Sequence, residues 1–390
     1  MILQALKYCR YKGTKNQWNL EGRPLGNNSQ FVGLDKINLV VGRNASGKTR
    51  TILAIRQVAD LLCGDAKLSH LVHDTGEYTL LFKEKDSDIE YFFEFKKGKI
   101  RQEILKIDGE EKLNRAEGNL FYNEIGKYLS FKPKEDDSLS ISKGDSEQQP
   151  FFDSLYAWGK TLTHYKFGGT LGKDAFIKDL NKILEQDSDI DLKDGSDVIE
   201  ALVKGKEINY DFINAIIRDM DHIDYPLTSV DASRLKHIPI GFGLTVHEAD
   251  LDDITDQLEM SQGMFRALSL LIQLNYSLLS DKPRCILIDD IGEGLDYDRS
   301  RKLIDLIIEK ANNSAVQVIM TTNDRFVMNK VPLTYWSIIK RERNKSIFYN
   351  YQNSQKNFDD FSMTGLNNFD FFSTDFFSTG FDEYIAEAEE

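Results

Sequence analysis

The sequence predicts an α/β protein with a mixed β-sheet at its core, surrounding helices and a mostly helical inserted lobe. Residues 37–41 form a short apolar run, which leads into a glycine-rich loop and then into a helical pattern over residues 51–62. Farther along the chain, strand patterns alternate with helical patterns at 264–279, 284–288, 300–311 and 316–320. Strands that alternate with helices after such a loop build a sheet covered by helices, so the fold class is α/β.

The rest of the chain supplies the outer elements of this fold. Residues 2–11 are rich in β-forming and hydrophobic types and predict a first strand. Further strand patterns follow at 78–82, 89–95, 100–107 and 238–246, and a terminal hairpin is predicted at 335–351. Residues 132–149 are polar and serine-rich, which predicts a surface loop, and helical periodicity is present in pieces such as 175–184 and 211–220.

The composition predicts a cytoplasmic globular protein without a membrane segment. No run of about 18 apolar residues is present, so we expect no transmembrane helix. The N-terminus lacks a basic region followed by a long apolar stretch, and the three cysteines lie far apart, which fits a reducing compartment. The formal net charge is −14, which argues mildly against a protein that coats DNA but leaves room for a local basic groove.

The strand at 37–41 runs directly into the segment GRNASGKT, which has the Walker A pattern GxxxxGK[ST]. Backbone N–H groups of such a loop, and of the helix that follows it, surround a chain of phosphates. Lys48 is then expected to reach the β- and γ-phosphates of ATP, and the Thr49 hydroxyl to bind Mg²⁺. The residues that we expect to contact the nucleotide here are Gly42, Arg43, Asn44, Ala45, Ser46, Gly47, Lys48, Thr49 and Arg50.

A second apolar strand, ending in the sequence ILIDD, has the Walker B pattern. We expect Asp289 to hold Mg²⁺, either directly or through a water molecule. The next carboxylate, Asp290, is expected to orient or deprotonate the attacking water. The two motifs together predict a catalytic site for ATP hydrolysis.

The segment SQGMFR, residues 261–266, precedes the apolar helix at 264–279. It resembles the SxGxxR form of the ABC signature, and with the Walker motifs it makes the chain similar to the ATPase heads of the RecF, SMC and overcoming-lysogenization-defect (OLD) class. The resemblance implies that Ser261 and Gly263 contact the γ-phosphate of an ATP molecule held by the opposite protomer. The alternative is an ordinary helix N-cap at Ser261.

Two segments after the Walker B strand also resemble this class. Leu295-Asp296 is similar to the D-loop, which crosses the dimer interface in the family, although Asp296 can equally be an N-cap for the next helix. Asn323 follows a threonine pair where the family usually has a switch histidine, and Asp290 stands where the family usually has glutamate. Both departures imply slow hydrolysis. The Q-loop glutamine is not clear, and Gln102 and Glu103 are the candidates by their order along the chain.

The resemblance predicts how the chain divides. Residues 1–129 and 236–356 are expected to form an ABC-type head, residues 130–235 an inserted lobe without heptads, and residues 357–390 a tail rich in phenylalanine and aspartate. The start of the chain also resembles the AAA15/AAA21 group of bacterial ATPases, whose members often occur in phage defence beside a separate effector. Only about 40 residues follow the last predicted strand, too few for the Toprim nuclease domain of OLD proteins.

We therefore expect an ATPase that uses ATP and Mg²⁺ and dimerises, or forms a larger oligomer, around sandwiched ATP. Its expected partner is a separate, nuclease-like effector, with DNA as a possible ligand and no membrane. One alternative is an ATP-binding sensor or scaffold with little hydrolysis, and another is the ATPase subunit of a transporter. The tail either packs its phenylalanines back onto the head or serves as a docking peptide.

Overall fold

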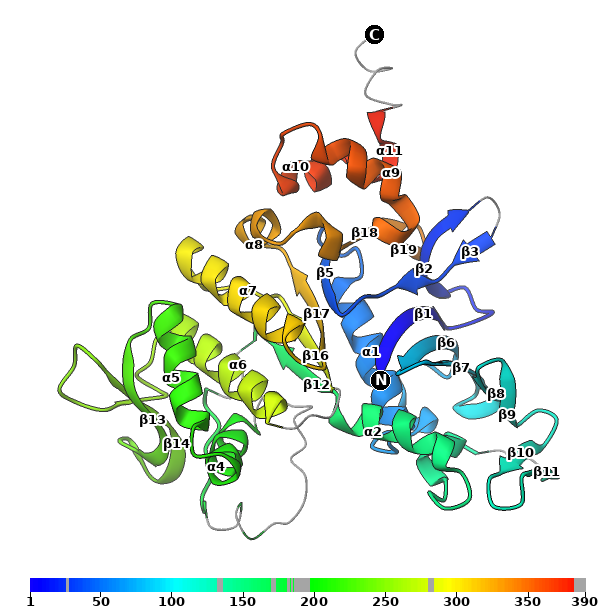
Figure 1. Ribbon diagram of the computed structural model, residues 1–390, viewed down its shortest axis with the longest axis horizontal. Coiled ribbons are helices and arrows are strands. Elements are labelled where there is room, and N and C mark those ends of the chain that lie inside the picture. Colours follow the sequence, from blue (N-terminus) through cyan, green and yellow to red (C-terminus); the bar gives the residue numbers. More distant parts are fainter. Residues whose placement is uncertain are drawn as a thin grey trace. The chain divides into compact units, whose positions relative to one another are not determined.

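The computed structural model describes residues 1–25, 28–131, 136–169, 173–180, 183, 185, 197–279 and 284–381. The chain forms two compact units (Figure 1). Unit 1 comprises Met1–Leu162 and Val331–Glu390, and unit 2 comprises Thr163–Lys330. The boundaries that we predicted for head, lobe and tail do not coincide with these units, and they stay a prediction.

Unit 1 is built on a long mixed sheet. Its strands, in neighbouring order, are β11 (Lys127–Ser130), β10 (Asn119–Tyr122), β9 (Glu110–Asn114), β8 (Lys99–Ile107), β7 (Ser87–Lys96), β6 (Thr75–Glu84), β1 (Ile2–Arg10), β2 (Trp18–Leu25), β19 (Lys345–Asn350), β18 (Trp336–Glu342) and β5 (Ile37–Val41). The short strands β3 (Asn28–Gln30) and β4 (Val32–Gly33) pair with β2 and β1. β18 runs parallel to β5, and β19 runs parallel to β2. From β1 through β6, β7, β8, β9 and β10 to β11, each strand is antiparallel to the next.

Alternating side chains explain why the outer strands form a sheet with one buried face. In β7, Ile89, Tyr91, Phe93 and Phe95 are buried while the residues between them are more exposed. The predicted strands at 78–82, 89–95 and 100–107, the first strand and the hairpin at 335–351 are therefore confirmed.

The helices of unit 1 are α1 (Lys48–Leu62), α2 (Asp153–Thr161), α9 (Tyr351–Ser362), α10 (Asn368–Ser373) and α11 (Phe376–Thr379), with 3₁₀ turns at Leu68–His70, Ser140–Lys143, Pro150–Phe152 and Leu333–Tyr335. α2 packs closely on α1, because a Cβ atom on Gly159 would lie only 2.5 Å from the carbonyl oxygen of Ala59. This contact fixes the C-terminal half of the helix that follows the Walker A loop.

Unit 2 contains a parallel group of three strands, β12 (Thr163–Lys166), β16 (Arg284–Asp289) and β17 (Val316–Thr322). It also has an antiparallel group, β13 (Leu227–Leu235), β14 (Ile238–Glu248) and β15 (Thr255–Asp256). Its helices are α4 (Val198–Ile208), α5 (Phe212–His222), α6 (Gln262–Leu278), α7 (Tyr297–Asn312) and α8 (Arg325–Lys330).

A buried polar cluster joins three of these helices. Asp219 of α5 accepts a hydrogen bond from Asn275 of α6 at 2.6 Å and forms an ion pair with Lys310 of α7 at 2.9 Å. Lys310 also donates to the side-chain oxygen of Asn275 at 3.0 Å. Because each member of the cluster has a partner, it ties the helices together without leaving a buried charge unpaired.

One predicted helix is wrong. Residues 175–180 are not helical, because Ile177 instead makes an isolated β-bridge with Phe242. Part of the remainder of that prediction, up to 184, falls outside the described residues. The prediction of a helix near 211–220 is confirmed by α5.

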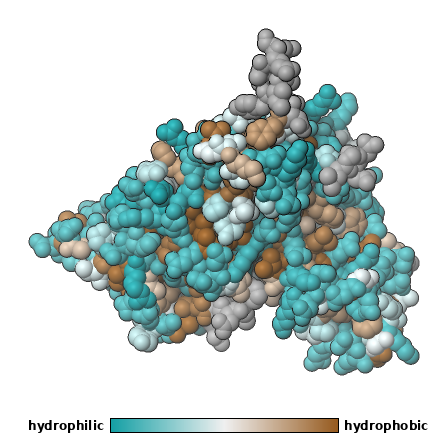
Figure 2. Space-filling model, turned by 45° about the horizontal axis from the view of Figure 1, so that its top comes forward, coloured by the Kyte–Doolittle hydropathy of each residue, from teal (hydrophilic) through white to brown (hydrophobic). Residues whose placement is uncertain are grey.

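In the part of the chain that the structure describes, no helix is long and apolar enough to cross a membrane. The face drawn in Figure 2 is mostly hydrophilic, with small hydrophobic areas between the polar side chains.

Candidate nucleotide site

The Walker A segment forms a tight loop between β5 and α1 in unit 1. All five residues of β5 are buried, which holds the start of the loop against the sheet. Gly47 has a φ of 118°, a conformation that favours glycine, and α1 begins at the next residue. A side chain on Gly42 would also lie 2.7 Å from the carbonyl oxygen of Ile339, so both glycines of the pattern are required by the geometry.

Polar groups inside the loop suit a chain of phosphates. The Lys48 ammonium donates to the carbonyl oxygens of Gly42 at 2.7 Å and Arg43 at 3.4 Å, so it curls over the loop. The Ser46 hydroxyl is buried and has no hydrogen-bond partner among the described residues. Ser346 of β19 donates to the Ser46 carbonyl oxygen at 2.7 Å and braces the loop from the sheet side. The structure thus brings the whole predicted segment from Gly42 to Arg50 together as one loop and first helical turn.

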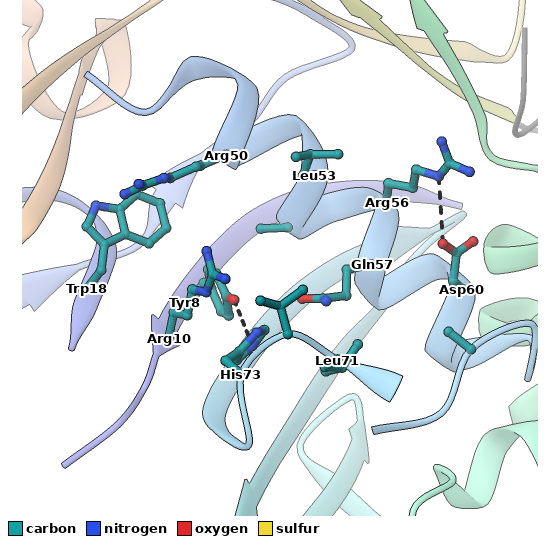
Figure 3. Close-up of a pocket in the computed structure, with 13 residues that line it drawn as sticks. Tyr8, Arg10, Trp18, Arg50, Leu53, Arg56, Gln57, Asp60, Leu71 and His73 are labelled. Carbon is teal, nitrogen blue, oxygen red and sulfur yellow. Dashed lines mark hydrogen bonds and ion pairs between the residues drawn. The ribbon is translucent and has the colours of Figure 1, made fainter. Parts of the chain in front are cut away.

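A cavity of about 310 Å³ lies beside α1 (Figure 3). Its wall includes three arginines and two large aromatic side chains: Arg10, Arg50, Arg56, Tyr8 and Trp18. The Trp18 ring comes within 3.3 Å of where a Cβ on Gly47 would lie, and the Arg50 guanidinium lies 5.5 Å from the centre of that ring. The cavity therefore begins where the Walker A loop ends.

The cavity wall also holds buried polar atoms without partners. Trp18 Nε1, Arg10 Nε and His73 Nδ1 make no hydrogen bond among the described residues. His73 Nε2 lies 2.9 Å from the Tyr8 hydroxyl, and burial lowers the pKa of His73 to about 4, so the ring is neutral at pH 7. The sequence reasoning missed Arg10, Trp18 and His73, because they lie outside any motif and come from separate strands and turns.

The Walker B residues lie at the end of β16 in unit 2, beside the end of β17. Thr321 Oγ1 donates to Asp289 Oδ1 at 2.5 Å and accepts from the Asp290 backbone N–H at 2.9 Å. Asn323 Nδ2 donates a hydrogen bond to Asp290 Oδ1 at 3.3 Å. Asp290 has a φ of 58°, a strained conformation for a residue other than glycine. The structure therefore joins the predicted residues Asp289, Asp290 and Asn323 into one network, with Thr321 as a residue that the sequence reasoning did not assign.

The signature segment caps α6. Ser261 is the N-cap, and its hydroxyl accepts from the backbone N–H of Met264 at 3.2 Å. A side chain on Gly263 would come within 2.9 Å of the Gly294 carbonyl oxygen, so the signature packs directly on the loop that leads to α7. The helix-cap interpretation of Ser261 is confirmed, and it is compatible with a further contact to an anion at the same helix end.

Arg266 holds the signature and the loop after Walker B together. It is only 5% exposed, and its guanidinium donates to the carbonyl oxygens of Glu293 at 2.7 Å, Gly168 at 3.1 Å and Gly169 at 3.2 Å. The next predicted residue, Asp296, is the N-cap of α7, where it accepts from the Arg299 backbone at 3.0 Å and pairs with the Arg299 side chain at 2.7 Å. These two hydrogen bonds lower the pKa of Asp296.

The two Q-loop candidates, Gln102 and Glu103, are neighbours in β8, and their role stays a prediction. Glu103 is completely buried in β8, where its carboxylate binds Tyr91, Arg115 and Ser140. Lys166, at the end of β12, is paired in register with Asp289 and is exposed. This position could not be recognised from the sequence, because β12 is only four residues long and carries no motif.

No cluster of three or more histidine, cysteine or acidic side chains that could hold a metal ion occurs within the described ranges. Mg²⁺ commonly binds through one or two protein ligands together with substrate phosphates and water. Thr49 lies in unit 1 and Asp289 in unit 2, and their joint binding of Mg²⁺ stays a prediction.

A family model described as "AAA domain, putative AbiEii toxin, Type IV TA system" matches residues 37–329, a span that contains the Walker A loop, the signature segment and the Walker B strand. No curated protein matches the chain.

Solved structures with a similar fold include SMC head domains. An SmcHead bound to the C-winged helix domain of ScpA has a TM-score of 0.53 and 15% identity, over 89% of this chain and 97% of that chain. The SMC head domain from Thermotoga maritima has a TM-score of 0.45 and 13% identity, over 89% and 98%. An Smc head with an extended coiled coil, bound to the C-terminal domain of ScpA derived from Pyrococcus furiosus, has a TM-score of 0.48 and 15% identity, over 92% and 99%. At 15% identity the first of these establishes a likeness of fold, that of an SMC-type P-loop ATPase head.

Proposed function

Since the chain belongs to the AAA-domain family described as a putative AbiEii toxin, and is a P-loop ATPase of this SMC-like type, we propose that it is an ATP-driven dimerisation switch. The Walker A loop carries this proposal. Gly42 and Gly47 leave no room for side chains, Lys48 curls over the loop, and Ser46 presents an unpartnered hydroxyl. Such a loop followed by a helix N-terminus suits a polyphosphate.

We assign the chemistry of hydrolysis to residues of the Walker A and Walker B segments and to Asn323. Lys48 binds the β- and γ-phosphates, and Thr49 and Asp289 hold Mg²⁺, which neutralises charge on the phosphates. Asp290 orients the attacking water, and Asn323 holds the Asp290 carboxylate through its amide. Lys166 adds a positive charge next to Asp289.

In the proposed switch, two copies sandwich two ATP molecules. Each Walker A loop then faces Ser261 and Gly263 of the other copy, with Asp296 at the same interface. Support comes from the exposed Ser261 side chain at the N-terminus of α6, a helix of 17 residues. Hydrolysis would reopen the dimer.

Ser261→Arg should prevent this dimerisation while leaving ATP binding by the monomer intact, because a long cation replaces the hydroxyl at the helix end. We expect sedimentation velocity with Mg²⁺-ATP to show a dimer for the wild type and a monomer for the variant, with affinity reduced at least about tenfold. Ser229→Arg, at an exposed position of β13, is the matched control. ATP-dependent dimers of Ser261→Arg with wild-type affinity would disprove the trans contact.

The readout of the switch is proposed to be a separate, nuclease-like effector protein that acts in antiviral defence or DNA processing. An SMC head of similar fold is known bound to a domain of ScpA, which shows that this fold can present a surface to a second protein. The description of the matched family, which names a toxin, also fits a role in defence.

A second candidate is an ATP-binding sensor with little hydrolysis, and the bond between Asn323 and Asp290 favours it, because it holds a short carboxylate back at the strand end. Asp290→Glu extends the carboxylate by one methylene, and we expect phosphate release at saturating Mg²⁺-ATP to rise about fivefold or more. Asp298→Glu, on the exposed first turn of α7, should leave the rate unchanged. An unchanged rate in Asp290→Glu would mean that the length of this side chain does not limit hydrolysis.

A further inference from the structure

The C-terminal helices α9, α10 and α11 fold back onto unit 1 (Figure 1). Their buried side chains form a small aromatic core of Phe358, Phe361, Phe371, Phe376 and Phe377. Phe358 and Phe371 have ring centres 4.6 Å apart, and Phe377 packs edge-on against Tyr349 of β19 at 5.1 Å. The prediction that these phenylalanines pack back onto the head is confirmed.

This tail reaches the Walker A loop. Asp375 Oδ2 forms an ion pair with the Arg43 guanidinium at 3.1 Å. Next to it, Lys340 of β18 donates to the Ser378 hydroxyl at 3.2 Å and lies 5.9 Å from the centre of the Phe377 ring. A cavity of about 320 Å³ lies between tail and loop, lined by Arg43 to Ser46, Ile339 to Arg341, Phe372, Asp375 and Phe377.

The side chain of Asp375 pairs with Arg43 and does not cap the helix that follows it. Asp375 is the N-cap residue of α11, and aspartate at this position usually accepts a hydrogen bond from the helix backbone. Here its side chain makes no such bond, its backbone has a φ of 57°, and its carboxylate turns to Arg43. By contrast, the side chains of Asn350 and Asn367 cap α9 and α10.

We propose that the tail is a clasp on the Walker A loop that lowers its affinity for ATP. The clasp acts by pairing with Arg43, a cation of the phosphate-binding loop, so that this charge is not offered to an anionic ligand. Release of Asp375 returns Arg43 to the nucleotide, so a partner that binds the tail would increase ATP binding. The inference rests on the proposed function for its ATP readout.

Asp375→Asn tests the clasp by removing one charge with little change of shape. We expect the variant to bind ATP about two- to tenfold more tightly in isothermal titration calorimetry at low salt, since exposed ion pairs are weak and screened. Asp360→Asn removes the same charge elsewhere in the tail and should leave the affinity unchanged. Unchanged or weaker binding by Asp375→Asn would overturn the proposal.

The Arg43→Ala background separates the clasp from general repulsion. In that background Asp375→Asn should change ATP affinity by no more than about 1.5-fold, because the partner of the pair is gone. An equal gain with and without Arg43 would show that the tail does not act through Arg43.

Hydrogen exchange of the backbone amides of residues 44–48 gives a readout that needs no ATP. Loss of the ion pair should speed exchange in this loop for Asp375→Asn and not for Asp360→Asn. If the wild type bound no ATP, the proposed function would fail, but hydrogen exchange would still test the contact between tail and loop. Identical exchange of residues 44–48 in the wild type and both variants would rule out the clasp.

Discussion

Lys48→Ala should lower the affinity for ATP by at least about 100-fold. The Lys48 ammonium already lies over the loop, held by the carbonyl oxygens of Gly42 and Arg43, and no other cation of the loop is buried with it. Charge-assisted contacts to phosphate are the strongest that a loop of this kind makes. Isothermal titration calorimetry with Mg²⁺-ATP measures the loss.

Lys15→Ala, at an exposed position of the same unit, serves as the control and should bind ATP as the wild type does. Circular dichroism would establish that Lys48→Ala is folded. ATP affinity within twofold of the wild type in Lys48→Ala would show that the Walker A loop is not the site of binding.

Arg266→Ala should be the most destabilising of the substitutions considered. It removes a buried guanidinium and leaves three carbonyl oxygens, of Glu293, Gly168 and Gly169, without their donor. We expect unit 2 to lose about 3–5 kcal/mol of folding free energy, as when one side of a buried charged network is removed. Thermal unfolding monitored by circular dichroism should show a midpoint several degrees lower.

Arg218→Ala is the matched control, since its side chain is 64% exposed and forms an ion pair with Asp211, the N-cap residue of the same helix. Its expected cost is within about 1 kcal/mol. Equal midpoints for Arg266→Ala and Arg218→Ala would mean that the signature segment and the loop after Walker B are not held together by Arg266.

The motifs could be found from the sequence because each lies in one short segment with a physical requirement. Gly47 must adopt a positive φ, Ser261 must cap a helix, and a buried strand must end at Asp289. Such requirements act between residues a few positions apart, so the local sequence is enough to recognise them. The hairpin of β18 and β19 was predictable for the same reason.

Contacts between distant segments were not predictable. Arg43 and Asp375 lie 332 positions apart, and neither residue indicates the other. Lys166 acquires its place beside Asp289 only when β12 adds to β16. Residues 175–180 have helical periodicity, yet a bridge from Ile177 to Phe242 prevails, because tertiary contacts override a weak local preference. The hydrogen bonds of Glu103 with Tyr91 and Arg115, each 12 positions away in the sequence, were not predictable for the same reason.

Phosphate release from Mg²⁺-ATP by the wild-type protein, beside Lys48→Ala, is the most direct test of the central claim that this P-loop protein hydrolyses ATP. We predict slow release by the wild type, abolished in the variant, because in the proposed mechanism Lys48 holds the transferred phosphate and Asp290 orients the water. Release by the wild type that is no faster than by Lys48→Ala would contradict the claim.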